Sequence, residues 1–166
     1  AVAKGYNVIT IHNSAGTGKV YEDLKRYVYD KGEGTDKTGQ SLDTIAHTRG
    51  MMISMLQVEA IRTAQERFGK GKTMTPEQVR WGLENLNLTQ ERLEELGFGE
   101  IMRPVRTSCD NHMGDDWARI AQWDGAKFQV VSDWYQADKS VVDPLVKDMA
   151  ARYAKEKNIT PRDCGK

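Results

Sequence analysis

The sequence has 166 residues, enough for one domain with its own core or for part of a larger protein. Its 24 Lys and Arg residues balance 24 Asp and Glu residues, so no net charge attracts the chain to nucleic acid or to an anionic membrane, and no nucleic-acid partner is expected. No apolar run of these residues is long enough to span a bilayer, and we expect no signal peptide among them. The start, Ala1-Val2-Ala3-Lys4, is expected of a processed chain or a fragment.

The first structural signal is a β-branched run within residues 6–11, which predicts a strand. A loop ending Gly16-Thr17-Gly18-Lys19 and a helical pattern from Lys19 to Asp30 follow, in the order of a phosphate-binding loop. Such a loop needs a glycine where this chain has Asn13, and a serine or threonine where it has Val20. The stretch is therefore interpreted as an ordinary loop that leads into a helix.

The longest helical pattern covers residues 44–68, after a polar, glycine-rich stretch at 32–43 that is typical of an exposed loop. Its apolar residues occupy a wide arc, so this helix is expected to be buried on more than one side. These residues are Met51, Met52, Met55, Leu56, Val58, Ile61 and Ala64.

Two shorter helices follow, each with a recognisable start. Thr75, Pro76 and Gln78 form the pattern of a capping box with proline in the first turn. Thr89 is the expected N-cap of the next helix, and Gly97 ends it. The charged residues of both helices are expected to face solvent.

Beyond Pro104 the pattern changes from helix to strand. Asp124-Gly125 lies between two β-prone runs and predicts a hairpin, whose tryptophans are expected to pack in the sheet. A final helix is predicted from about Val141 to Lys157, with an irregular tail after it. Strand, helices, hairpin and helix in this order predict an α/β or α+β fold with too few strands for a complete large sheet.

No stretch carries the signature of an active site. Cys109 and His112 could form half of a zinc site, but the other half needs a second close pair and Cys164 stands alone. The same two residues could act as a thiol nucleophile and its base, although no family signature surrounds them. Asp115-Asp116 is interpreted as a turn. We therefore expect no catalytic residues, no metal and no cofactor.

Five segments, taken in order, resemble one known family. They are GYNVIT at 5–10, HTRGMMISMLQVEAIRTAQ at 47–65, TPEQVRWGLENL at 75–86, the stretch 103–135 with its QWDG turn, and YAKEKNITPRDC at 153–164. They are similar to the crossing strand, the long core helix, the helix after it, the last strands and the tail of type I periplasmic solute-binding proteins. These proteins are the ligand-capturing subunits of ABC importers for branched-chain amino acids, amides or aromatic acids. The chain resembles their C-terminal part.

The resemblance implies an α/β fold: the C-terminal portion of a two-lobe protein with three-layer α/β lobes, incomplete on its own. Residues 1–166 would be a fragment in which 1–9 form a hinge-crossing strand and 10–115 belong to the first lobe. Residues 116–166 would return through the hairpin to the second lobe, which holds the C-terminal helix. The protein would be periplasmic and non-enzymatic, and would close on a small ligand. Its expected partners are the membrane permease and ATPase subunits of the transporter, and the missing N-terminal part or a second copy.

By the same resemblance, the ligand-binding residues lie at the start of the long helix, which reads His47-Thr48-Arg49-Gly50. Arg49 offers a two-pronged donor to a carboxylate, Thr48 offers a hydroxyl, and the helix N-terminus offers unpaired N–H groups. His12, just past the crossing strand, is expected nearby.

The implied compartment is oxidising, so Cys109 and Cys164 are expected to form a disulfide that pins the tail. Two rival hypotheses remain. In the first, the chain is a small secreted enzyme that uses Cys109 and His112, and its thiol would react readily with alkylating agents. In the second, it is an interaction module that associates with itself through an exposed apolar helix.

Overall fold

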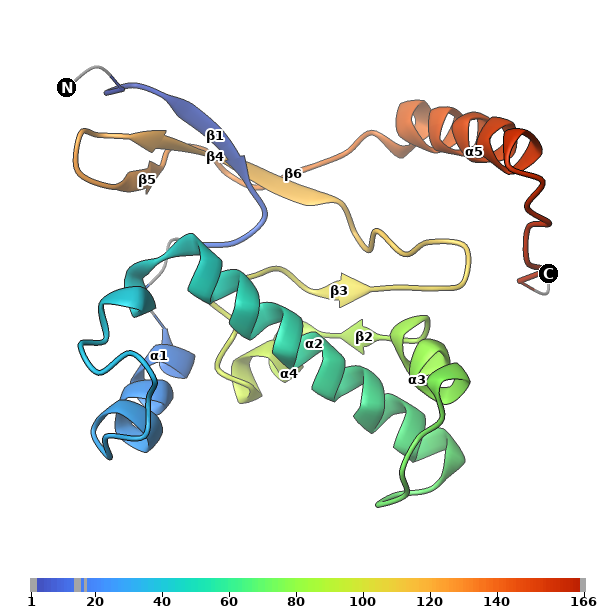
Figure 1. The fold of residues 1–166 in the computed structure, drawn as a ribbon. Coiled ribbons are helices and arrows are strands. Elements are labelled where there is room, and N and C mark those ends of the chain that lie inside the picture. The colour runs from blue at the N-terminus through green and yellow to red at the C-terminus, as the bar shows by residue number, and fades with distance from the viewer. Residues whose placement is uncertain (1–2, 14–15, 17, 165–166) are drawn as a thin grey trace.

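The computed structural model describes residues 3–13, 16 and 18–164 (Figure 1). Residues 1–2 of the expected crossing strand, residues 14, 15 and 17 of the glycine loop and residues 165–166 of the tail lie outside the described residues. The elements, in chain order, are β1 (Asn7–Thr10), α1 (Lys19–Leu24), the π-helical turn η1 (Lys25–Tyr29), the 3-10 turn η2 (Gln40–Asp43), α2 (Ile45–Phe68), α3 (Pro76–Leu83), β2 (Asn87–Leu88), α4 (Gln90–Glu95), β3 (Val105–Arg106), β4 (Trp117–Trp123), β5 (Phe128–Val130), β6 (Tyr135–Gln136) and α5 (Lys139–Glu156).

The larger sheet is organised around β4. One edge of β4 pairs with β1 in antiparallel register, with Thr10 opposite Arg119, and the other edge pairs with β5. Strand β6 pairs with the start of β4. The predicted hairpin is confirmed: the Asp124 carboxylate accepts hydrogen bonds from the backbone N–H groups of Ala126 and Lys127, and Gly125 has a φ of 109°. This turn brings β5 back beside β4, while β2 and β3 form a separate two-stranded sheet.

Helix α2 forms where the sequence predicts it, and Thr44 caps it by accepting the backbone N–H of His47. One side of α2 is buried and includes Met52, Met55, Ala60 and Ala64. The expectation of burial on more than one side is wrong for the described residues, because Val58 is 63% exposed and Ile53 is 56% exposed. No described element covers that outer side.

The core lies between α2, α4 and the first turns of α1. Its buried members are Tyr21, Met52, Met55, Leu88, Leu93, Phe98, Ile101 and Met102. Helices α3 and α4 begin at the predicted caps: Thr75 and Gln78 form the full capping box, and the Thr89 hydroxyl accepts the N–H of Arg92. Both helices contact α2: Gly82 of α3 packs against Ala60, and Arg92 of α4 donates to Glu59.

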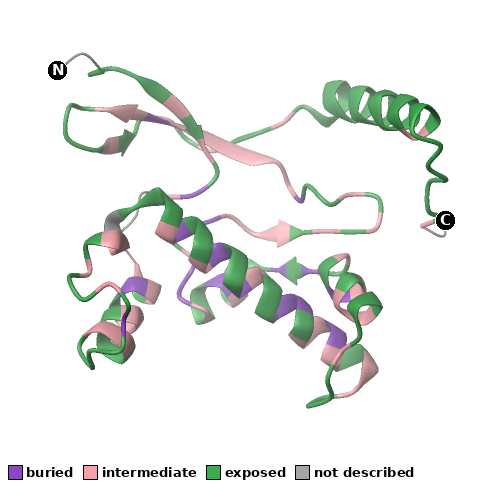
Figure 2. Cartoon of the chain, in the orientation of Figure 1, coloured by how far each residue is buried: buried purple, intermediate pink, exposed green. Residues whose placement is uncertain are grey.

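Helix α5 forms close to its predicted position but has no buried residue (Figure 2). It stands apart from the other helices (Figure 1). Its apolar side chains are exposed along the whole helix: Val141, Val142, Leu145, Val146, Met149 and Tyr153. The division of the chain into two lobes therefore stays a prediction.

Candidate ligand-binding site

A cavity of about 800 Å³ lies between the sheet and the first turns of α2. The volume falls within the range of small-molecule sites. Residues of β1, the hairpin and the start of α2 line the cavity. Among them is the aromatic pair Trp123 and Phe128, whose ring centroids are 5.2 Å apart. The polar lining residues are Thr10, His12, Asn13, Arg49 and Lys127.

The start of α2 reaches this cavity through one face of the helix. Ile45 and Arg49 both line it, because residues four apart in a helix lie on the same side. Thr44 caps the 24-residue helix at this end, and the N-terminal end of a helix carries a partial positive charge. Arg49 therefore adds a full positive charge where the helix already favours an anion.

His12 also lines the cavity, next to Arg49, and is almost fully buried, with 2% exposure. The chain around it is held by the isolated bridge between His12 and Met102, and by the Asn13 N–H, which donates to the carbonyl of Ile101 at 2.7 Å. Its Nε2 lies 3.2 Å from Nε of Arg49, and its Nδ1 lies 2.7 Å from the carbonyl oxygen of Asn13. The structure thus brings together two of the four ligand residues expected from the sequence.

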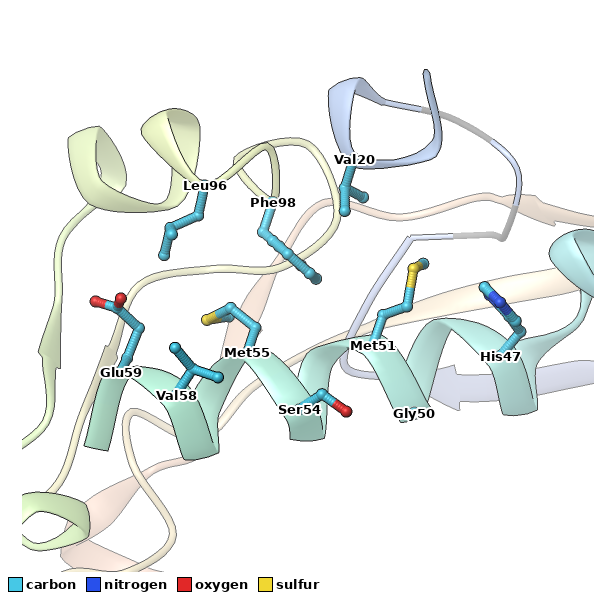
Figure 3. A pocket seen from close by; sticks show the side chains of 10 residues that line it. All are labelled: Val20, His47, Gly50, Met51, Ser54, Met55, Val58, Glu59, Leu96 and Phe98. Atoms are coloured by element: carbon cyan, nitrogen blue, oxygen red, sulfur yellow. The ribbon is translucent and has the colours of Figure 1, made fainter. Parts of the chain in front are cut away.

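Thr48 and His47 lie elsewhere. Thr48 is fully buried, its hydroxyl lies 2.5 Å from the Tyr21 hydroxyl, and it donates to the carbonyl of Thr44 at 3.2 Å. A ligand in the cavity cannot reach it without opening that packing. His47 lines a separate apolar groove of about 520 Å³ along α2, together with Met51, Met55 and Phe98 (Figure 3). The structure does not bring these two residues to the cavity.

The charged side chains described in the lining of the cavity are all positive. Arg49 and Lys127 line it, and no Asp or Glu occurs among its described lining residues. Lys127 sits in the hairpin, where hydrogen bonds from the backbone N–H of Lys127, from the Gln129 side chain and from the backbone N–H of Ala126 lower the pKa of Asp124 to about 2. That carboxylate is engaged in the turn, so it stays ionised and holds the hairpin that carries Lys127.

Sequence reasoning missed Lys127, Trp123 and Phe128 as lining residues. The QWDG turn predicts the hairpin, but only the pairing of β4 with β1 places that hairpin opposite α2. Pairing between strands more than a hundred residues apart leaves no local signal in the sequence.

A disulfide joins Cys109 and Cys164, with 5.6 Å between their Cα atoms. Arg162, in the tail beside it, donates to Glu84 at 2.5 Å and holds the pKa of that carboxyl below its usual range. His112 lies 3.5 Å from the same Glu84 oxygen. Because Cys109 is bonded, it offers no thiol in this state.

Within residues 3–13, 16 and 18–164, no group of three or more His, Cys, Asp or Glu side chains is arranged to hold a metal ion. Among the same residues, no helix has the length and apolar character needed to cross a membrane.

No protein-family model and no curated protein sequence matches the chain. Two solved structures do. The crystal structure of an ABC transporter permease from the Pseudomonas fluorescens group matches with a TM-score of 0.90 and 37% sequence identity, over 99% of this chain and 40% of that one. A branched-chain amino acid ABC transporter from Thermus thermophilus, solved with bound valine, matches with a TM-score of 0.62 and 22% identity, over 85% of this chain and 36% of that one.

Both similar structures are of ABC transporter proteins, and the chain spans less than half the length of each. The expected fold class, part of an α/β fold, is confirmed, as is the resemblance to part of a type I solute-binding protein. The similarity to the Thermus protein, at 22% identity, shows the fold alone.

Proposed function

We propose that the chain is part of an extracytoplasmic solute-binding subunit of an ABC importer, and that it binds a small ligand in the cavity beside α2. The observation that carries this proposal is Arg49 at the capped end of α2, in a cavity that also holds Lys127 and no described acidic side chain. A guanidinium binds a carboxylate through two parallel hydrogen bonds. A branched-chain amino acid or an aromatic carboxylate would place its apolar body against Trp123 and Phe128. An amide is the third proposed ligand class.

The cavity wall draws on both proposed lobes. In this proposal residues 1–9 form the hinge-crossing strand, 10–115 belong to the first lobe and 116–166 to the second. Arg49 would then come from the first lobe, and Trp123 and Lys127 from the second. A ligand that touches both sides favours the closed arrangement, because it interacts with the two lobes together only when they approach.

Two apolar surfaces that no described residue covers suggest where a further polypeptide would pack. The exposed apolar side of α5 and the outer side of α2 would pack against the remaining N-terminal part of the same protein or, in a dimer, against a second copy. The permease and ATPase subunits of the importer would complete the transporter. The Cys109–Cys164 bond supports an oxidising location such as the periplasm.

No observation favours the rival enzyme hypothesis. It needs a thiolate at Cys109, and that sulfur is bonded to Cys164. The self-association hypothesis is decided by measuring the mass of the chain across a concentration series.

Calorimetry with the 166-residue chain tests the proposed site. The probes are benzoate and valine as carboxylates and benzamide as a neutral analogue. Arg49→Ala should weaken the binding of the carboxylates more than tenfold, because the two-pronged contact is lost. Lys147→Ala, which removes one exposed cation from α5, is the matched control and should bind as the unmodified chain does. Equal carboxylate affinity in Arg49→Ala and the unmodified chain would remove Arg49 from the site.

A further inference from the structure

Both ring nitrogens of His12 are engaged in the folded chain. Nδ1 lies 2.7 Å from the backbone carbonyl oxygen of Asn13, and Nε2 lies 3.2 Å from Nε of Arg49. A carbonyl oxygen can only accept a hydrogen bond, and a guanidinium nitrogen can only donate one. The two contacts therefore require a neutral imidazole that carries its proton on Nδ1 and presents a lone pair at Nε2.

This arrangement occupies one edge of the Arg49 guanidinium. The group is planar and has five N–H donors, one of them on Nε. Once Nε donates to a buried and immobile acceptor, the plane of the guanidinium is fixed, and the four donors on Nη1 and Nη2 remain. Among the residues that the structure describes, no carboxylate pairs with Arg49, although the side chain lines the cavity.

Free arginine side chains occupy many rotamers, and a ligand that binds one must first restrict them. An arginine that is already held by a neighbour binds a planar anion with less loss of freedom. His12 is suited to this role because it is 2% exposed and is held by the chain on both sides, through the bridge to Met102 and the hydrogen bond from Asn13 to Ile101.

We propose that His12 is a positioning residue of the ligand site: it accepts the Nε–H of Arg49 and so presents Nη1 and Nη2 to a two-oxygen anion in the cavity. The inference rests on the proposed function. It assigns to His12 a part in selectivity, since a neutral amide gains less than a carboxylate from an oriented guanidinium. With both ring nitrogens engaged, His12 would offer the ligand no hydrogen bond of its own.

The first test needs no ligand. Nitrogen-15 spectra of the histidine ring should show His12 as the neutral form protonated at Nδ1 at neutral pH. The Nε–H signal of Arg49 should be protected from exchange with water, and this protection should be lost in His12→Leu, which has no acceptor. A His12 ring protonated at Nε2, or an Arg49 signal of equal protection in both proteins, would overturn the inference even if the cavity binds ligand.

The second test uses benzoate and benzamide. His12→Leu should weaken benzoate binding about fivefold, by loss of orientation, and leave benzamide binding nearly unchanged. His12→Gln keeps an acceptor on its side-chain carbonyl and should restore most of the benzoate affinity. In the Arg49→Ala background, His12→Leu should cause no further loss, because the two residues act through one contact.

The outcomes of this second test separate the two proposals. An equal loss for both probes, or the same loss in the Arg49→Ala background, would show that His12 only supports the fold and would overturn the inference. If neither probe binds the unmodified chain, the proposed function is contradicted for this cavity, while the ring spectra still decide whether His12 orients Arg49.

Discussion

Gly82 of α3 lies directly against the backbone carbonyl of Ala60 in α2: a Cβ atom at Gly82 would be 2.0 Å from that oxygen and 3.2 Å from the Cβ of Ala64. The absence of a side chain is therefore what lets α2 and α3 approach. Ala60 and Ala64 are both fully buried in this contact.

Gly82→Ala should destabilise the chain by more than about 2 kcal/mol, since the two helices must separate and open the packing around Ala64. Urea unfolding followed by circular dichroism measures this. Gly50→Ala is the matched control, because Gly50 also lies inside a helix but a Cβ there meets nothing within 4 Å. It should stabilise the chain by about 0.5–1 kcal/mol, the ordinary gain of alanine over glycine. Equal effects at the two positions would contradict the close contact.

Glu59 forms the central ion pair beside α2. Its carboxylate accepts hydrogen bonds from Arg92 at 2.7 and 3.0 Å and from Arg62 at 2.9 Å. Burial is the largest single influence on its pKa and raises it, but the hydrogen bonds and positive charges of the two guanidinium groups together outweigh burial and leave the pKa of Glu59 lowered.

A lowered folded-state pKa means that the ion pairs stabilise the chain above the ordinary glutamate pKa of about 4.3, and that this contribution is lost as the pH falls through the folded-state value. Glu59→Gln should therefore lower the free energy of unfolding by about 1–2 kcal/mol at pH 7. This is less than for a fully buried ion pair, because both arginines are partly exposed and solvent screens their charges. The difference from the unmodified chain should shrink as unfolding is measured at successively lower pH below about 4. Glu66→Gln, at an exposed pair, should change stability by less than about 0.5 kcal/mol at every pH.

The disulfide closes a loop between positions 55 residues apart. Replacing both Cys109 and Cys164 by serine should cost roughly 2–4 kcal/mol, mainly because the unfolded chain gains freedom. The tail should also lose protection from proteases near Arg162. Mass spectrometry of the non-reduced, alkylated protein from an oxidising compartment should find no alkylated cysteine. Two alkylated cysteines would count against the bond and against the periplasmic location.

The apolar side of α5 should contribute little to the stability of this chain by itself. Met149→Gln should change the free energy of unfolding by less than about 0.5 kcal/mol, since Met149 is 65% exposed. Leu93→Ala, at a fully buried position, is the contrasting variant and should cost about 2–5 kcal/mol. A large cost for Met149→Gln that depends on protein concentration would show that α5 is covered by a second copy.

The elements themselves could be predicted from the sequence because their signals are local. A capping box needs only Thr75 and Gln78 within one turn, and a hairpin turn needs only Asp124 and Gly125 side by side. The range of α2 followed in the same way from its apolar spacing. With only two cysteines in the chain, one intramolecular pairing was available, and the structure contains it.

The candidate site could be predicted only in part. The family resemblance implied both Arg49 and Thr48, at the start of the long helix. That Arg49 lines the cavity while Thr48 is buried against Tyr21 depends on how α2 is rotated against its neighbours. Adjacent side chains on a helix point about 100° apart. Which of the two faces the cavity therefore depends on the rotation of α2 about its own axis, and the sequence alone does not give that rotation.

The sequence by itself determined where the main helices, the first strand and the hairpin lie, which caps begin α3 and α4, and which cysteines can pair. Each of these depends on residues close together in the chain or on a single possible choice. Only the tertiary structure decided that His12 meets Arg49 across 37 positions, that the hairpin carrying Lys127 faces α2, and that the apolar side of α5 is left open. These relationships arise from strand pairing and helix packing over long separations, where the free energy depends on three-dimensional contact and not on spacing along the chain.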